Sequence, residues 1–240
     1  MKNFTANMAI VVSFVLAFAL LSGTIIAQDV KGKGNLQTQD RKVANFKGIK
    51  VSGGFLVEVK QGKQEGLRIE AEERLMDKIV SEVKNGVLHI YTKGSVNSRK
   101  GMKAYITVNE LEKVEISGGV KVVGLSTFKA GDFQLDMSGG SNVKLAIDAK
   151  KIFSNMSGAS KVVLTGRADE LKLDMSGASN VDTQELAAKR VKVSASGASK
   201  IKVNASETLQ INASGASNIA YAGSPKIQAE TTAASKISKL

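Results

Sequence analysis

The chain has 240 residues, 34 Lys and Arg against 22 Asp and Glu, a formal net charge of +12, no Cys and one His. Without cysteine, disulfides, thiolate metal sites, cysteine nucleophiles and lipid-modified cysteine anchors are excluded, and one histidine excludes a metal site built from several histidines. The length suffices for one elongated domain or two small ones with a core.

The N-terminus has the charged, apolar, small-residue order of a secretory signal, with Lys2, the uncharged run Ala9–Leu21 and small residues up to Ala27. We expect cleavage after Ala27, and hence a signal peptide over 1–27. The alternative is a retained membrane anchor, because the apolar stretch extends to about 18 residues, the lower limit for a bilayer span. After cleavage no transmembrane span would remain, and the chain would be exported to the periplasm, the outer cell surface or the medium.

Residues 28–40 are polar and glycine-rich, which predicts a flexible leader. Residues 41–116 are predicted to be β-rich but irregular, either as longer first coils of the repeat that follows or as an appended β-subdomain. The segment Glu72–Ser81 has helical spacing of apolar residues, and Asn85-Gly86 predicts a tight turn. The predicted strands are Phe46–Val51, Phe55–Lys60, Leu67–Ala71, Val87–Thr92 and Met102–Val108.

Residues 117–240 form a repeat, in which the tripeptide Ser-Gly-Gly/Ala recurs at intervals of 21, 19, 19, 20, 18 and 18 residues. A degenerate copy begins at Thr232, and an earlier copy at Ser52 precedes Ser117 by 65 residues, a gap that would hold three more coils. The corner residues are Ser117, Gly118, Ser138, Gly139, Ser157, Gly158, Ser176, Gly177, Ser196, Gly197, Ser214 and Gly215. Glycine suits a sharp corner because it tolerates positive φ and close backbone approach.

Each repeat alternates apolar and polar residues on both sides of the tripeptide, which predicts two half-buried strands per coil. Stacking such coils buries a continuous core, and coils of about 18–21 residues predict an all-β, parallel β-solenoid. One inward column precedes each serine: Ile116, Met137, Met156, Met175, Ala195, Ala213 and Thr231. The other follows it: Val122, Val143, Val162, Val181, Ile201, Ile219 and Ile237. The first column shrinks toward the C-terminus, so the core is expected to taper there.

Four places after each serine, an outward column alternates lysine and asparagine. Its members are Lys121, Asn142, Lys161, Asn180, Lys200, Asn218 and Lys236. Alternation doubles the separation of the lysines and lets asparagine amides bond along the stack. Two interpretations stay open: a device for solubility and register, or a cationic comb that faces an anionic polymer.

Catalytic chemistry has little support. Asp136 and Asp174 fall in one outward column but two coils apart, a loose match to an inverting carboxylate pair. The serine columns predict hydroxyl ladders rather than nucleophiles, because no histidine accompanies them; His89, on a predicted strand, is expected to be structural. No phosphate loop, calcium nonapeptide or aromatic nucleic-acid platform occurs, so no cofactor, metal or nucleic-acid partner is expected.

Four motifs together resemble a known bacterial family: residues 46–55 (FKGIKVSGGF), 83–90 (VKNGVLHI), the repeated SGAS with Asn or Lys and Val, and 217–225 (SNIAYAGSP). The family is that of auto-transporter adhesins with a head GIN domain, also classed as a domain of unknown function and typical of Bacteroidetes-like bacteria. The resemblance covers about residues 40–240. It implies a right-handed parallel β-helix, a secreted or envelope location and no catalytic residues.

The expected function is that of a non-enzymatic adhesin or scaffold of the cell envelope. Its lysine, asparagine and serine ladders would bind an anionic glycan, lipopolysaccharide or an envelope protein, or pack against a second copy. The alternatives are a carbohydrate-active enzyme on the same fold, such as a polysaccharide lyase or hydrolase, and a periplasmic structural or sensing module.

Overall fold

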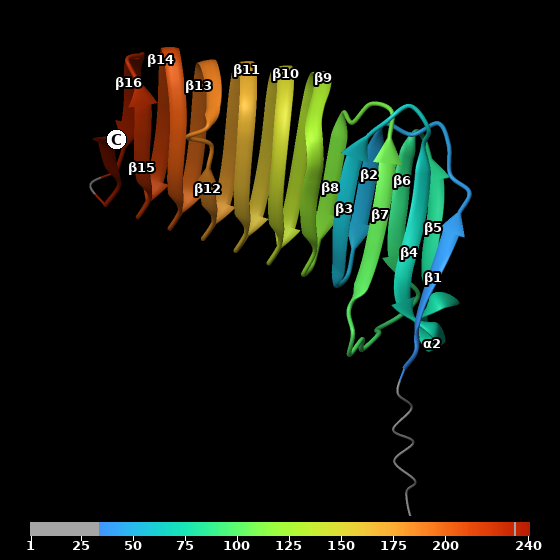
Figure 1. Ribbon diagram of the computed structural model, residues 1–240. Helices are drawn as coiled ribbons and strands as arrows, with labels where there is room; N and C mark the ends of the chain where they lie inside the picture. The colour runs from blue at the N-terminus through green and yellow to red at the C-terminus, as the bar shows by residue number, and fades with distance from the viewer. Residues whose placement is uncertain (1–33, 233) are drawn as a thin grey trace, which may run out of the picture. The chain divides into compact units, whose positions relative to one another are not determined.

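The computed structural model describes residues 34–232 and 234–240, which form a β-solenoid of about seven turns (Figure 1). The predicted signal peptide and residues 28–33 of the predicted leader lie outside the described residues. Among the residues described, no helix has the length and apolarity that a membrane span requires.

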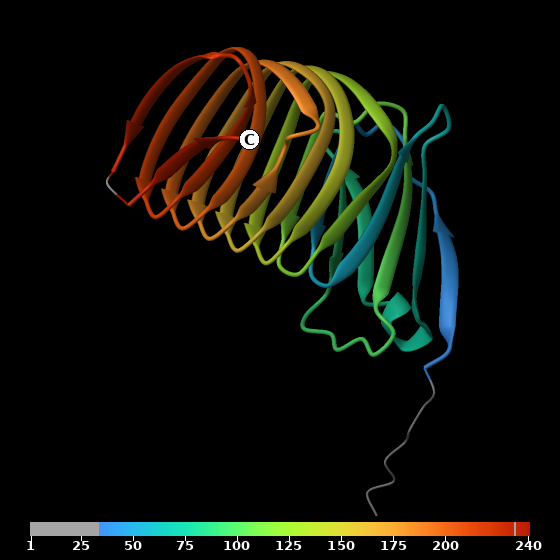
Figure 2. The same cartoon turned by 60° about the vertical axis from the view of Figure 1, so that its left-hand side comes forward.

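The repeat half is a stack of parallel strands in which each coil pairs with the next at the same repeat position. Ser157, for example, lies opposite Ser138 on one side and Ser176 on the other. Figure 2 shows these strands as successive arcs. The strands are β8 (Lys113–Ser117), β9 (Lys121–Gly139), β10 (Asn142–Gly158), β11 (Lys161–Gly177), β12 (Asn180–Asp182), β13 (Leu186–Gly197), β14 (Lys200–Gly215), β15 (Asn218–Gly223), β16 (Lys226–Thr231) and β17 (Lys236–Lys239).

Each coil has two flat parts that meet at the Ser-Gly corner. We call the outer surface of the segments that lead into the corner face A, and that of the segments that leave it face B. In β10, residues 151–157 belong to face A and residues 142–149 to face B, and the ladders skip Lys150 between them. Alternate side chains in both parts point inward, as period two requires.

The predicted inward columns form the core. Met137, Met156 and Met175 are 3–5% exposed, and the valines and isoleucines of the second column are fully buried from Val122 to Ile219. Alanine replaces methionine at Ala195 and Ala213, and both alanines are buried like the methionines. In the last coil, every residue of β16 is exposed, including Thr231, because no further coil covers it within the described residues.

The corner is fixed by a double hydrogen bond to one glycine carbonyl. The Gly139 oxygen accepts the amide of Ala159 at 3.1 Å and the hydroxyl of Ser160 at 3.1 Å, both from the next coil. The second serine of each corner is buried and makes the same kind of bond, which confirms a hydroxyl ladder. These serines are Ser141, Ser160, Ser179, Ser199 and Ser217.

The chain before the repeat builds the first coil and then a cap. Strands β2 (Gly48–Ser52) and β3 (Phe55–Gln61) pair directly with β8 and β9, and Ser52 lies opposite Ser117. The prediction of three coils between these serines is therefore wrong. The intervening chain leaves the stack and returns on the far side, where β6 (Val87–Thr92) pairs with β2 and β7 (Met102–Val108) pairs with β3.

Antiparallel strands close this end of the solenoid. Strand β1 (Leu36–Arg41) pairs with β4 (Gly66–Glu72), β4 pairs with β7, and β5 (Ile79–Lys84) pairs with β6. The N-terminal part is thus both a continuation of the parallel ladders and an antiparallel addition to them, so each of the two expected arrangements describes part of it.

Two local predictions are corrected. The helix expected over residues 72–81 is the single turn α2 (Glu73–Met76), since the chain from Ile79 pairs with β6 as a strand. Asn85 and Gly86 have positive φ and make the predicted tight turn of that hairpin. The predicted flexible leader is wrong for residues 36–40, which form β1; its side chains are almost all exposed, so no apolar alternation marks it as a strand.

A buried carboxylate anchors the cap. Glu72, at the end of β4, accepts the amides of Arg99 and Lys100 at 2.6 and 3.2 Å, the hydroxyl of Ser98 at 3.2 Å and the guanidinium of Arg74 at 2.7 Å. Burial raises the pKa of Glu72, but these donors outweigh it and lower the pKa to about 2. The ionised carboxylate therefore ties residues 98–100 to the strand.

We expect Gly158→Ala to destabilise the solenoid by about 1–3 kcal/mol or more. Gly158 has a φ of 102°, and an added Cβ would lie 2.7 Å from the Gly139 oxygen. Gly140→Ala is the matched control, because a Cβ there meets nothing within 4 Å. Urea unfolding of both variants measures the difference, and equal midpoints would contradict this account of the corner.

We expect Glu72→Gln to lower stability at neutral pH, because the amide cannot accept as the carboxylate does. The folded pKa lies below the ordinary value of 4.5, so the stabilisation is present above about pH 4.5 and is lost as the pH falls toward 2. The gap in unfolding free energy between wild type and variant should close over that interval in urea titrations. Glu73→Gln, at an exposed neighbour, should show no such closing.

Candidate functional site

The lysine and asparagine residues of the repeat form one continuous column on face B. Adjacent members lie directly opposite each other from Lys121 to Lys236, which confirms their predicted register. Six of the seven are exposed, and Asn142 is half-buried. With strands about 4.8 Å apart, successive lysines recur at roughly 9.6 Å. We call this set the Lys/Asn column.

The charges on face B are predominantly positive. The column two residues further along each strand adds Lys144, Lys202 and one carboxylate, Asp182, which lies 3.7 Å from Lys202. Within the described residues, none of the four lysines of the Lys/Asn column has a carboxylate within 4.0 Å. In these two columns, six lysines and Asp182 lie on the strands from β9 to β17, and Glu58 continues the second column onto β3.

On face A, the outward columns four and two places before the corner serine carry equal numbers of positive and negative side chains. These are Lys50, Lys113, Lys172 and Lys192 against Glu115, Asp136, Asp174 and Glu230. Several are paired locally, with Lys50 2.9 Å from Glu115 and Lys172 2.8 Å from Asp174. Hydrogen bonds from Lys113 and, to a smaller extent, from Lys50 lower the pKa of Glu115. The charges of these two columns of face A therefore balance, whereas positive charge exceeds negative charge in the two columns of face B.

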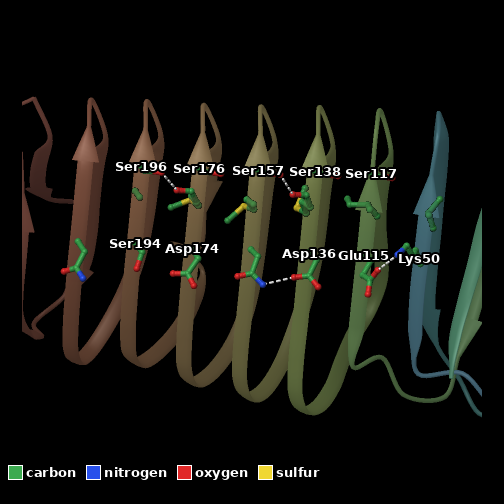
Figure 3. A pocket seen from close by; sticks show the side chains of 18 of the residues that line it. Lys50, Glu115, Ser117, Asp136, Ser138, Ser157, Asp174, Ser176, Ser194 and Ser196 are labelled. Atoms are coloured by element: carbon green, nitrogen blue, oxygen red, sulfur yellow. Dashed lines mark hydrogen bonds and ion pairs between the residues drawn. The ribbon is translucent and has the colours of Figure 1, made fainter. Parts of the chain in front are cut away.

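A shallow groove of about 800 Å³ runs along face A beside the corners (Figure 3). Its two outward columns are the exposed first serines of the corners and a polar column. The polar column consists of Glu115, Asp136, Asn155, Asp174, Ser194 and Asn212. Asp136 accepts the side-chain amides of Gln134 at 2.7 Å and Asn155 at 2.8 Å. The structure therefore places Asp136 and Asp174 on opposite sides of the Asn155 strand, each with its own partners.

In one coil, β10, an apolar side chain occupies an outward position of face A and a polar side chain occupies the next inward position. Four places before the corner, the other coils carry lysine or glutamine, but β10 carries Phe153, which points outward and is half-buried. The next position is a buried aliphatic residue in neighbouring coils, but in β10 it is Ser154. A hollow of about 240 Å³ lies here, lined by Gln134, Phe153, Ser154, Asn155, Lys172 and Asp174.

The sequence analysis did not identify this inversion, although aligning the repeats on their serines would have shown it.

His89 lies opposite Lys50 and Glu82 in the ladders, and is half-buried. Across residues 34–232 and 234–240, no group of three or more His, Asp or Glu side chains is placed to hold a metal ion.

Solved structures share this fold. A "putative adhesin" from Bacteroides fragilis NCTC 9343 is 24% identical, with a TM-score of 0.78, over 86% of this chain and 97% of that chain. A "putative lipid binding protein" from Parabacteroides distasonis ATCC 8503 is 22% identical, with a TM-score of 0.72, over 87% of this chain and 98% of that chain. No curated protein matches the chain.

The sequence from residue 45 to residue 225 matches the model of one protein family, which spans the first coil, the cap and nearly the whole repeat. All four motifs that carry the resemblance noted above lie within this match. The chain therefore belongs to the family described as "Putative auto-transporter adhesin, head GIN domain".

Proposed function

We propose that the protein is a non-enzymatic adhesin or scaffold of the cell envelope that binds an anionic polymer along the Lys/Asn column. The observation that carries the proposal is the charge of face B, where two adjacent columns hold six lysines against two carboxylates, Asp182 and Glu58. Lipopolysaccharide and acidic glycans are the ligands that fit an exported protein with such a surface. The description of the Parabacteroides distasonis relative as a lipid binding protein agrees with a ligand that contains lipid, as lipopolysaccharide does.

The spacing of the column suits a polymer better than a small anion. Lysines about 9.6 Å apart cannot converge on one carboxylate or phosphate, but each can meet a different charge of an extended chain. A single exposed ion pair contributes about 0.2–1 kcal/mol, so affinity must come from several contacts made together. Such binding weakens with salt, because exposed charges are screened.

The names of the family and of the Bacteroides fragilis relative describe adhesins and support a non-enzymatic role. The Asn155 strand separates Asp136 from Asp174, so these two carboxylates remain a loose match to a glycosidase pair.

The proposal predicts that replacing Lys121, Lys161 and Lys200 together by glutamine weakens binding to lipopolysaccharide or polygalacturonate about tenfold. Three contacts of about 0.5 kcal/mol each sum to roughly 1.5 kcal/mol, close to a factor of ten. The matched control replaces Lys150, Lys192 and Lys226, which removes the same charge from parts of the coils outside face B. Titrations by surface plasmon resonance at low and high salt measure the affinities of wild type, the triple variant and the control. An equal loss in the control, or wild-type affinity that is insensitive to salt, would contradict the proposal.

An adhesin must also be accessible from outside. Protease treatment of intact host cells should therefore remove the protein, as detected by blotting with an antibody to residues 117–240. Survival in intact cells, followed by loss once the outer membrane is disrupted, would favour a periplasmic scaffold instead. A periplasmic marker protein that survives the first treatment controls for leakage.

A further inference from the structure

We propose that face A carries a second binding site, for an uncharged sugar unit, centred on the ring of Phe153. The site is separate from the Lys/Asn column, and nothing in the proposed function requires it. At this site in β10, an aromatic ring points outward and a hydroxyl points into the core.

The inversion is unfavourable for folding. Ser154 is 1% exposed and lies in register between Leu135 and Leu173, and its Oγ has no hydrogen-bond partner. An unpaired buried hydroxyl is unfavourable, because no hydrogen bond compensates for its loss of contact with water. Because the ring of Phe153 is only half-buried, it also contributes less hydrophobic stabilisation than a fully buried ring would. Residues that break a local rule in this way are expected at functional sites.

The surroundings of the ring supply hydrogen-bonding groups. Gln134 and Lys172 lie opposite Phe153 on the two neighbouring strands, and Asn155 lies two residues along its own strand. Together with Asp174 they line the hollow of about 240 Å³. That volume is below the 300–1,000 Å³ typical of sites for drug-sized ligands, which suits one sugar ring.

This combination matches the chemistry of a pyranose. The flat apolar face of the ring can pack against the C–H groups of a sugar, while amide and carboxylate groups bond its hydroxyls. The charges favour an uncharged sugar, because Lys172 is already paired with Asp174 at 2.8 Å and an acidic sugar would meet the carboxylates of Asp136 and Asp174. Asn155 and Asp174 also line the groove, so further sugars of a chain can extend along it beside the corner serines.

The decisive variants restore the pattern of the neighbouring coils. Phe153→Gln alone should weaken binding of neutral oligosaccharides at least tenfold, and Phe153→Tyr should retain it. Ser154→Leu alone should raise the unfolding midpoint, because it removes the unpaired hydroxyl. The double variant F153Q/S154L should be more stable than wild type and should not bind. A general loss of fold cannot produce this combination.

The probes are cellohexaose, mannohexaose and xylohexaose, with oligogalacturonate as the charged comparison. Calorimetric titration and saturation-transfer NMR of the full exported chain measure binding at 0.1 and 0.5 M salt. We expect at least one neutral hexasaccharide to bind with an affinity that salt does not change and that the Lys121, Lys161 and Lys200 substitutions leave intact. The proposal is overturned if none of the three binds wild type, or if Phe153→Gln binds as well as wild type. Either result leaves the proposed binding of anionic polymers untouched.

Discussion

The glycine carbonyl at each corner is the constraint on which the rest of the structure depends. It accepts an amide and a buried serine hydroxyl from the next coil, and the positive φ that aims it is available only to glycine without strain. A slip of one residue between coils would break both bonds and turn every inward side chain outward. The corner therefore fixes the register of the strands on both sides of it.

A fixed register turns sequence positions into columns. Inside, the columns pack valine on valine and methionine on methionine, and their sizes decide where the core narrows. Outside, the same register brings Lys121 beside Asn142, and Asp136 beside Asn155. The chain can thus vary its outer columns without changing its inward columns. Face B accumulates positive charge, whereas face A balances its charges and holds a polar groove.

The repeat half was predictable because its signals are local and recur. The tripeptide sets the coil length, and period two sets the inward columns, so both the solenoid and the Lys/Asn register follow from residues close together in the chain. The cap was not predictable in this way. The pairing of Ser52 with Ser117 spans 65 residues, and β1 joins β4 through backbone bonds while its side chains stay exposed. The antiparallel pairing of β5 with β6 likewise overrides the helical spacing around Leu75.

The Phe153–Ser154 inversion shows why a repeat is informative where it deviates. In a chain without repeats, an outward phenylalanine would carry little information, since more than half of a protein's accessible surface is apolar. Here the neighbouring coils act as internal controls at the same two positions, and they place aliphatic residues inside and lysine or glutamine outside. Restoring that pattern would remove an unpaired hydroxyl and bury more apolar surface. Because the fold would be more stable without the inversion, its explanation lies in what the exposed ring contacts rather than in the folding of the chain.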